Sequence, residues 1–73
     1  MKKIVITGSN GLLGQTLVNL LMKEPENYSV FGLSKGDNRM NRNDFLYYDI
    51  DITNQAQLEE CISYIQPSFI INT

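Results

Sequence analysis

The feature that most constrains this chain is a glycine-rich turn placed between two apolar segments of different periodicity. Gly8, Gly11 and Gly14 recur at every third position. Residues 3–7, just before them, contain Ile-Val-Ile, a run of β-branched side chains that predicts a strand buried on both faces. The residues after them carry an apolar stripe at helical spacing, made of Leu13, Leu17, Leu20 and Leu21. A buried strand that turns through glycines into a helix is therefore the expected start of the fold.

Three further strands are predicted along the rest of the chain. Residues 28–34 and 68–72 contain short apolar runs, and residues 45–48 form a shorter one. Between the second and third strands, residues 35–43 are rich in Gly, Asp and Asn and predict a loop. The first helix is expected to end before Pro25.

A second helix is predicted between the third and fourth strands. Thr53 or Asn54 is expected to cap it, and Asn54 is followed three positions later by Gln57, a pattern that resembles a capping box. The apolar stripe of this helix is made of Leu58, Cys61, Ile62 and Ile65. Pro67 is expected to end it. We therefore expect Cys61 to pack in the core as an unreactive side chain rather than to act as a reactive thiol.

The order strand, helix, strand, strand, helix, strand predicts an α/β fold with a doubly wound parallel sheet of the Rossmann type. Residues 1–73 are expected to form the N-terminal part of one dinucleotide-binding domain, with about four strands and two helices. No helix follows the fourth strand, so one face of that strand should expose apolar side chains. We expect either a longer natural protein or self-association through the exposed sheet.

Composition excludes several classes of function. A net charge of −2 provides no basic field for nucleic acid. The chain has no histidine and one cysteine, which excludes a disulfide within the chain and a metal site built on His or Cys. The apolar run at residues 4–6 is too short for a signal peptide or a membrane helix. We therefore expect a cytoplasmic protein with no membrane partner.

Charge is unevenly distributed along the chain. All six basic residues lie between Lys2 and Arg42, and five of the eight acidic residues lie between Asp44 and Glu60. One interpretation is that these are solvated charges of loops and helix ends. The other is that a phosphate group lies near the basic side chains Lys35, Arg39 and Arg42.

The glycine turn has the residue types that a dinucleotide site needs. Gly8 permits a tight turn out of the strand, Gly11 allows close approach of a pyrophosphate, and Gly14 allows the helix to pack near the sheet. The helix N-terminus supplies free N–H groups and partial positive charge. We predict contacts to the dinucleotide from Gly8, Asn10, Gly11, Leu12, Leu13 and Gly14. The alternatives are an ordinary strand-to-helix turn and a Walker-type loop, which would need Lys where Gln15 stands.

The end of the second strand bears on the choice of cofactor. An acidic residue there binds the ribose of NAD, whereas a basic group accommodates the 2′-phosphate of NADP. This chain has Ser34 and Lys35 at that position and no acid. NADP(H) is therefore favoured over NAD(H), with Ser34 and Lys35 contacting the phosphate. The alternative is that residues 35–38 are only a turn.

The segment from Thr7 to Gly14 resembles the fingerprint of extended short-chain dehydrogenases/reductases. Residues 49–54 and 67–72 resemble the dTDP-4-dehydrorhamnose reductase branch of that superfamily. The resemblance implies that Asp51 and Ile52 hold the adenine. The alternative for Asp51 is a carboxylate that caps the helix after it.

The resemblance also implies an activity for the intact protein: NAD(P)-dependent reduction of a 4-keto nucleotide sugar, in the formation of dTDP-rhamnose for surface polysaccharide. The family protonates the carbonyl with a Tyr that has a Lys four positions later. No tyrosine of this chain has that partner, since the residues at that offset from Tyr28, Tyr47, Tyr48 and Tyr64 are Gly32, Asp51, Ile52 and Ser68. We therefore predict no catalytic residue in these 73 residues and an inactive isolated chain.

Two other functions fit the same pattern. One is a non-catalytic NAD(P)-binding regulatory subunit, and the other is a nucleotide-sugar epimerase or dehydratase of the same superfamily. Tyr47 and Tyr48 lie on opposite faces of the third strand, so one should pack in the core and the other could cover a ligand. Core packing is the preferred interpretation.

Overall fold

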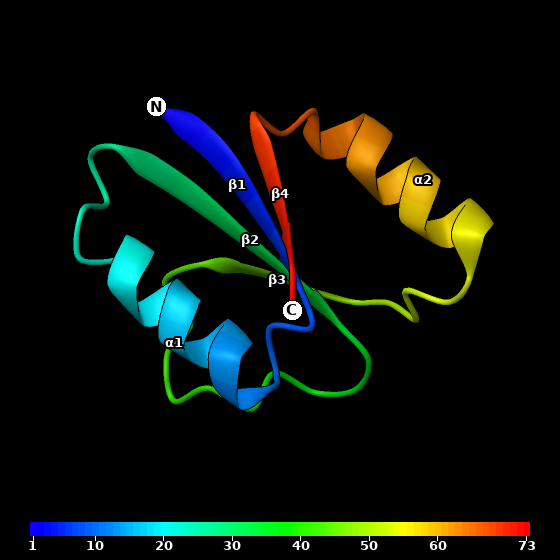
Figure 1. Cartoon of the computed structure of the whole chain (residues 1–73), viewed down its shortest axis with the longest axis horizontal. Helices are drawn as coiled ribbons and strands as arrows, with labels where there is room; N and C mark the ends of the chain where they lie inside the picture. Colours follow the sequence, from blue (N-terminus) through cyan, green and yellow to red (C-terminus); the bar gives the residue numbers. More distant parts are fainter.

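A computed structural model describes the whole chain, residues 1–73, as a parallel sheet with one helix on each face (Figure 1). The elements in chain order are β1 (Lys2–Thr7), α1 (Leu12–Leu21), β2 (Tyr28–Ser34), β3 (Leu46–Asp49), α2 (Gln55–Ile65) and β4 (Phe69–Asn72). The strands lie in the order β3-β2-β1-β4, and every pairing is parallel. This is the strand order of the first part of a Rossmann fold, which confirms the predicted fold class.

β1 lies at the centre of the sheet and contributes to two cores. Ile4 and Ile6 point to the face covered by α1, where they pack with Val18 and Val30. Val5 points to the opposite face, which is covered by α2. The second core is completed by Phe31, Leu33, Ile50 and Ile65. Successive residues of a strand face opposite sides, so an uninterrupted apolar run is what a strand covered on both faces requires.

The rotation of α1 differs from the one expected from its leucines. Gly14 and Val18 are the buried residues of this helix, and Leu17 and Leu21 pack beside them. Leu13 and Leu20 are 61% and 53% exposed, so the predicted stripe was wrong for these two residues. Gly14 sets the rotation because it has no side chain and lies where the helix comes closest to the turn.

The second helix begins as predicted. The Asn54 side chain accepts a hydrogen bond of 3.1 Å from the N–H of Gln57, which makes Asn54 the cap. The Gln57 side chain does not return the bond and accepts from the N–H of Asp51 instead. At the other end, Gln66 has a positive φ of 53°, and its N–H donates to the carbonyl of Ile62. Pro67 then prevents the helix from continuing.

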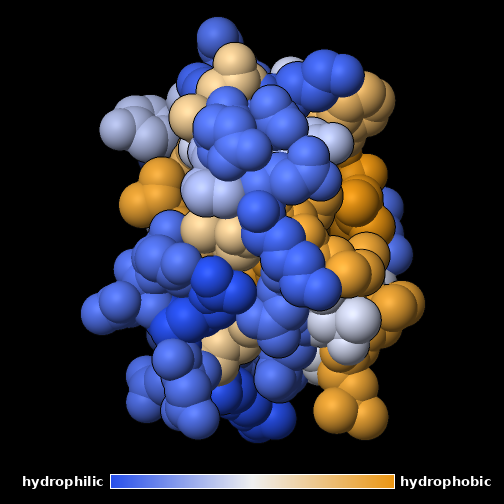
Figure 2. Space-filling view, turned by 90° about the vertical axis from the view of Figure 1, so that its left-hand side faces the viewer, coloured by the Kyte–Doolittle hydropathy of each residue, from blue (hydrophilic) through white to orange (hydrophobic).

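Neither helix is long and apolar enough to cross a membrane. The surface in Figure 2 is mostly hydrophilic, with apolar side chains gathered along one side. The large apolar side chains of α1 and β4 that remain exposed are Leu12, Leu13, Leu20, Phe69 and Ile70. Self-association through such residues stays a prediction.

The rotation of α1 can be tested with two truncations in the same helix. Val18→Ala should lower the free energy of unfolding by about 2 kcal/mol, because it removes fully buried methyl groups and leaves a cavity. Leu20→Ala removes a larger but exposed side chain and should change stability by about 0.5 kcal/mol or less. Urea unfolding followed by circular dichroism would measure both. A larger loss for Leu20→Ala would show that the helix faces the sheet through its leucine stripe.

Candidate functional site

The candidate site lies at the carboxyl edge of the sheet. All four strands run in the same direction, so the segments that follow them meet at this edge. The chain steps from β1 to β2 and β3 on one side, whereas β4 lies on the other side of β1. In open α/β sheets, ligands bind outside the carboxyl ends at such a change of direction. The glycine turn follows β1 and therefore lies at this point.

The glycine turn ends at a helix whose first N–H groups are free. Gly8 has a φ of +73°, and its N–H donates to the carbonyl of Leu33 at 2.8 Å. Gly11 closes the turn by donating to the carbonyl of Gly8 at 3.0 Å. Gln15 makes the first helical bond, to the carbonyl of Gly11, and no side chain caps the helix. The backbone N–H groups of the residues just before Gln15 therefore have no partner within the helix, and such groups can bind an anion.

The three glycines have different reasons to be glycine. A Cβ on Gly8 would lie 2.8 Å from the Thr73 hydroxyl oxygen, and a Cβ on Gly14 would lie 2.7 Å from the Cα of Ser9. Both residues are therefore required by packing within the chain. A Cβ on Gly11 would meet nothing closer than the Gly8 carbonyl, at 3.4 Å, and the backbone of Gly11 is one that any residue can adopt. Its missing side chain leaves open space beside the helix N-terminus.

Ser9 packs the glycine turn against the sheet. It is 1% exposed, and its hydroxyl has no hydrogen-bond partner within the chain. A Cβ on Gly32 of β2 would lie 2.6 Å from this hydroxyl oxygen, so the glycine in β2 provides the room for Ser9.

Asn10 ties the glycine turn to the loop that joins β2 and β3. Its side-chain amide donates to the carbonyl of Asp37 at 2.9 Å and to the hydroxyl of Tyr47 at 3.1 Å, with a longer contact to the carbonyl of Lys35. Its side-chain oxygen accepts from the N–H of Arg39 at 3.0 Å. Asn10 is 8% exposed, so these groups are shielded from water. Asn10 was predicted to contact the cofactor. Its side chain is used instead in hydrogen bonds that hold the loop against the glycine turn.

Tyr47 is the residue of the site that the sequence did not reveal. Its hydroxyl lies 3.0 Å from the carbonyl oxygen of Ser34 and 2.5 Å from that of Gly36, and it accepts from Asn10. Burial raises the pKa of this phenol, so it stays protonated and able to donate. Core packing was the preferred interpretation of this tyrosine, with a residue that covers a ligand as the alternative. Its ring does pack, edge-on against Phe45, while its hydroxyl joins the two loops.

Lys35 and Asp51 come together although they follow different strands. Lys35 is exposed after β2, and its Nζ lies 4.0 Å from a carboxylate oxygen of Asp51. The other oxygen of Asp51 accepts from the N–H and the hydroxyl of Thr53, at 2.9 and 2.6 Å. These bonds lower the pKa of Asp51, with a smaller contribution from Lys35, so the carboxylate is charged at neutral pH. Asp51 thus shapes the turn before α2 while Asn54 caps the helix.

The remaining predicted residues lie at the same edge. Ser34 ends β2 half-buried, and its carbonyl accepts from the N–H of Ile50 at 3.0 Å. Ile52 is 40% exposed beside Asp51. At the end of β4, Asn72 accepts a hydrogen bond of 2.8 Å from the Thr7 hydroxyl, which joins β4 to the start of the glycine turn.

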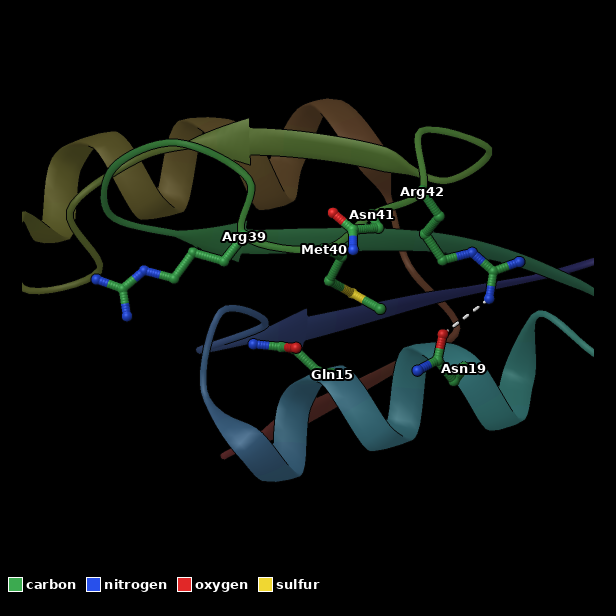
Figure 3. A pocket seen from close by; sticks show the side chains of 6 residues that line it. All are labelled: Gln15, Asn19, Arg39, Met40, Asn41 and Arg42. Atoms are coloured by element: carbon green, nitrogen blue, oxygen red, sulfur yellow. Dashed lines mark hydrogen bonds between the residues drawn. The ribbon is translucent and has the colours of Figure 1, made fainter.

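The two arginines of the loop have different surroundings. Arg42 forms two hydrogen bonds of 2.6 Å with Asp44 and lowers the pKa of that carboxyl group. It also donates to the side-chain oxygen of Asn19 on α1, as Figure 3 shows. In the same view the Arg39 side chain extends away from Asn19. These residues line a hollow of 460 Å³ between α1 and the loop, together with Gln15, Met40 and Asn41. Arg42 is thus engaged with its neighbours, while Arg39 makes no side-chain hydrogen bond.

A family model matches almost the whole chain. The family is described as the NAD dependent epimerase/dehydratase family, and residues 4–73 match it. Among curated proteins, the 1-deoxy-D-xylulose 5-phosphate reductoisomerase of Ruegeria sp. (strain TM1040) is 40% identical over 72 residues, covering 93% of this chain and 18% of that protein.

Solved structures resemble the chain along its full length. The Bordetella bronchiseptica enzyme WbmH, in complex with NAD+, has a TM-score of 0.82 and 24% identity over 100% of this chain and 25% of its own. The L-threonine dehydrogenase of Clostridium difficile has a TM-score of 0.83 and 26% identity over 99% of this chain and 23% of its own. The dTDP-glucose 4,6-dehydratase of Bacillus anthracis, in complex with NAD, has a TM-score of 0.80 and 20% identity over 99% and 26%.

The chain spans 18% to 26% of the length of these four proteins. The three solved structures share the fold of this chain along its length. Two of these structures are complexes with NAD.

The hydrogen bonds from Asn10 to the loop between β2 and β3 can be tested with a nearly isosteric substitution. Asn10→Asp replaces the donating amide with an acceptor that faces carbonyl oxygens, and should lower the free energy of unfolding by about 1–3 kcal/mol. Trypsin should then cut the loop faster, after Lys35, Arg39 or Arg42. Asn41→Asp introduces the same charge at an exposed position of the same loop and should leave cleavage unchanged. Equal cleavage rates of the two variants would show that the hydrogen bonds of Asn10 do not hold the loop in place.

Proposed function

Because the chain belongs to the NAD dependent epimerase/dehydratase family, we propose that it supplies the dinucleotide-binding part of an NAD(P)-dependent oxidoreductase. The intact protein would reduce a 4-keto nucleotide sugar, as the dTDP-4-dehydrorhamnose reductases do. The observation that carries the proposal is the open space at Gly11 beside the uncapped start of α1. The missing side chain of Gly11 serves no packing within the chain, and the uncapped helix start beside it offers the N–H donors that a pyrophosphate would need.

The pyrophosphate would lie over the first turn of α1. Its oxygens would accept hydrogen bonds from the N–H groups of Leu12, Leu13 and Gly14, and the helix dipole would favour its negative charge. Gly8 and Asn10 would act by holding the turn in shape. Close approach of the phosphates depends on the absence of a side chain at Gly11.

The adenosine half would extend toward the ends of β2 and β3. Ser34 and Lys35 would contact the 2′-phosphate of NADP(H), and Asp51 with Ile52 would hold the adenine. The Lys35 side chain is 81% exposed and only 4.0 Å from Asp51, so it can turn to a phosphate while it stays close to the adenine site. An exposed cation at the end of β2 supports NADP(H) over NAD(H).

The bound dinucleotide would supply the hydride for reduction of a carbonyl group. The residues of this chain bind and orient it. The proton for the new alcohol would come from a Tyr-Lys pair that these 73 residues do not contain, so we expect the isolated chain to be inactive.

An epimerase or dehydratase of the same superfamily is the second candidate. The description of the matching family and the likeness to a dTDP-glucose 4,6-dehydratase favour it. The intact protein distinguishes the two. A reductase consumes one NADPH for each 4-keto sugar nucleotide converted, whereas an epimerase or dehydratase consumes none overall.

The role of Gly11 predicts a loss of binding without a loss of stability. Gly11→Ala should weaken NADPH binding by about tenfold or more, because a methyl group would occupy the place of the phosphates, a penalty of about 1.4 kcal/mol or more. Its urea midpoint should match that of the unmodified chain, since the new Cβ meets only one oxygen at 3.4 Å. Calorimetric titration would measure the affinity, with Leu20→Ala as the control. Undiminished NADPH binding by Gly11→Ala would contradict the proposed site.

Lys35 tests the choice between the two cofactors. Lys35→Ala should weaken NADPH binding about tenfold, by loss of a charged contact to the 2′-phosphate, and should leave NADH binding nearly unchanged. Lys23→Ala removes an exposed lysine beyond the other end of α1 and serves as the control. The NADP(H) assignment fails if NADH binds at least as tightly as NADPH and Lys35→Ala alters neither affinity.

A further inference from the structure

We propose that Asn10 is a deamidation site, and that the folded loop network suppresses its reaction. Asn10 and Gly11 form the only Asn-Gly pair in the chain. Glycine after asparagine favours this reaction because no side chain hinders the attacking backbone nitrogen. The pair lies within the turn that the proposed function assigns to the dinucleotide, although the reaction itself does not depend on that function.

The reaction needs only water and a base. The backbone nitrogen of Gly11 loses its proton to the base and forms a bond to the side-chain carbon Cγ of Asn10. The bond from Cγ to Nδ2 breaks, and the NH2 group takes up a proton from the base and leaves as ammonia. Water then opens the resulting cyclic imide at one of its two carbonyl carbons. The product is aspartate or isoaspartate at position 10, and no electron is transferred.

The folded structure holds both reacting groups away from this path. The Gly11 nitrogen is engaged as a donor to the Gly8 carbonyl at 3.0 Å. The Asn10 amide is fixed by the Asp37 carbonyl, the Tyr47 hydroxyl and the Arg39 N–H, at 2.9, 3.1 and 3.0 Å. Attack on Cγ requires the side chain to leave these partners and the turn to open. The rate in the folded chain is therefore limited by local opening of the loop.

The product would not fit the network that protects the asparagine. A carboxylate at position 10 cannot donate to the Asp37 carbonyl or the Tyr47 hydroxyl. Isoaspartate also adds one carbon to the main chain inside a tight turn. In either product, the loop after β2 loses these hydrogen bonds to the glycine turn, and a negative charge is added next to the turn that would hold the pyrophosphate. Deamidation would thus disable the site irreversibly.

Peptide mapping by mass spectrometry tests this directly. The unmodified chain is incubated at mildly alkaline pH, folded in buffer and unfolded in urea. We expect deamidation at Asn10 to be at least about tenfold slower in the folded chain, because it must await opening. Gly11→Ala should slow the reaction in urea, since a methyl group hinders the attacking nitrogen. Equal rates in buffer and urea, or no preference for Asn10 over the other asparagines in urea, would overturn the proposal.

A pair of hydroxyl deletions tests which contact protects Asn10. Tyr47→Phe removes the phenol that accepts from the Asn10 amide and should speed deamidation in the folded chain about threefold or more by easing opening of the loop. Tyr64→Phe removes an exposed phenol on α2 and should leave the rate unchanged. Equal rates in the two variants would argue against the network as the protecting element. The readout is a mass and needs no dinucleotide. A chain that deamidates as expected but binds no NADPH would therefore overturn the proposed function and support this inference.

Discussion

The close contact between α1 and the glycine turn at Gly14 is the constraint on which the rest of the structure depends. No side chain can stand there, because the Cα of Ser9 and the carbonyl of Gly8 lie against the helix. This contact sets the rotation of α1, so that Val18 packs over β1 and β2 and Leu20 faces outward. It also directs the free N–H groups of the helix to the carboxyl edge of the sheet. One packing constraint thus shapes both the core and the candidate site.

The second constraint is polar and joins segments that are far apart in the sequence. Asn10 and Tyr47 hold the loop after β2 against the glycine turn, and the same loop carries Lys35 and Arg39. Buried hydrogen bonds of this kind add modest net stability, but losing one partner is costly. The arrangement makes the site well defined and also sensitive to a single change of charge at position 10.

Much of the fold was predictable because it depends on local patterns. The apolar run in β1, the turn signals between strands, the Asn54 cap and the stripe from Leu58 to Ile65 each report on neighbours within a few residues. The candidate site was partly predictable because its glycines stand in a strand-to-helix context. The leucines of α1 predicted the wrong rotation, since three-residue and four-residue spacings fit more than one helix face and Gly14 carries no apolar signal of its own.

The sequence by itself determined the order of the elements, the parallel α/β class and the glycine turn that begins α1, because these follow from periodicity and from backbone freedom at glycine. Only the tertiary structure decided which face of α1 is buried, that Tyr47 reaches Asn10, and that Lys35 stands beside Asp51. The physical reason is that these contacts cross from one strand end to another. Tyr47 and Asn10 are 37 positions apart in the sequence, and Lys35 and Asp51 are 16 apart. No local pattern records which strand ends meet at the edge of a sheet.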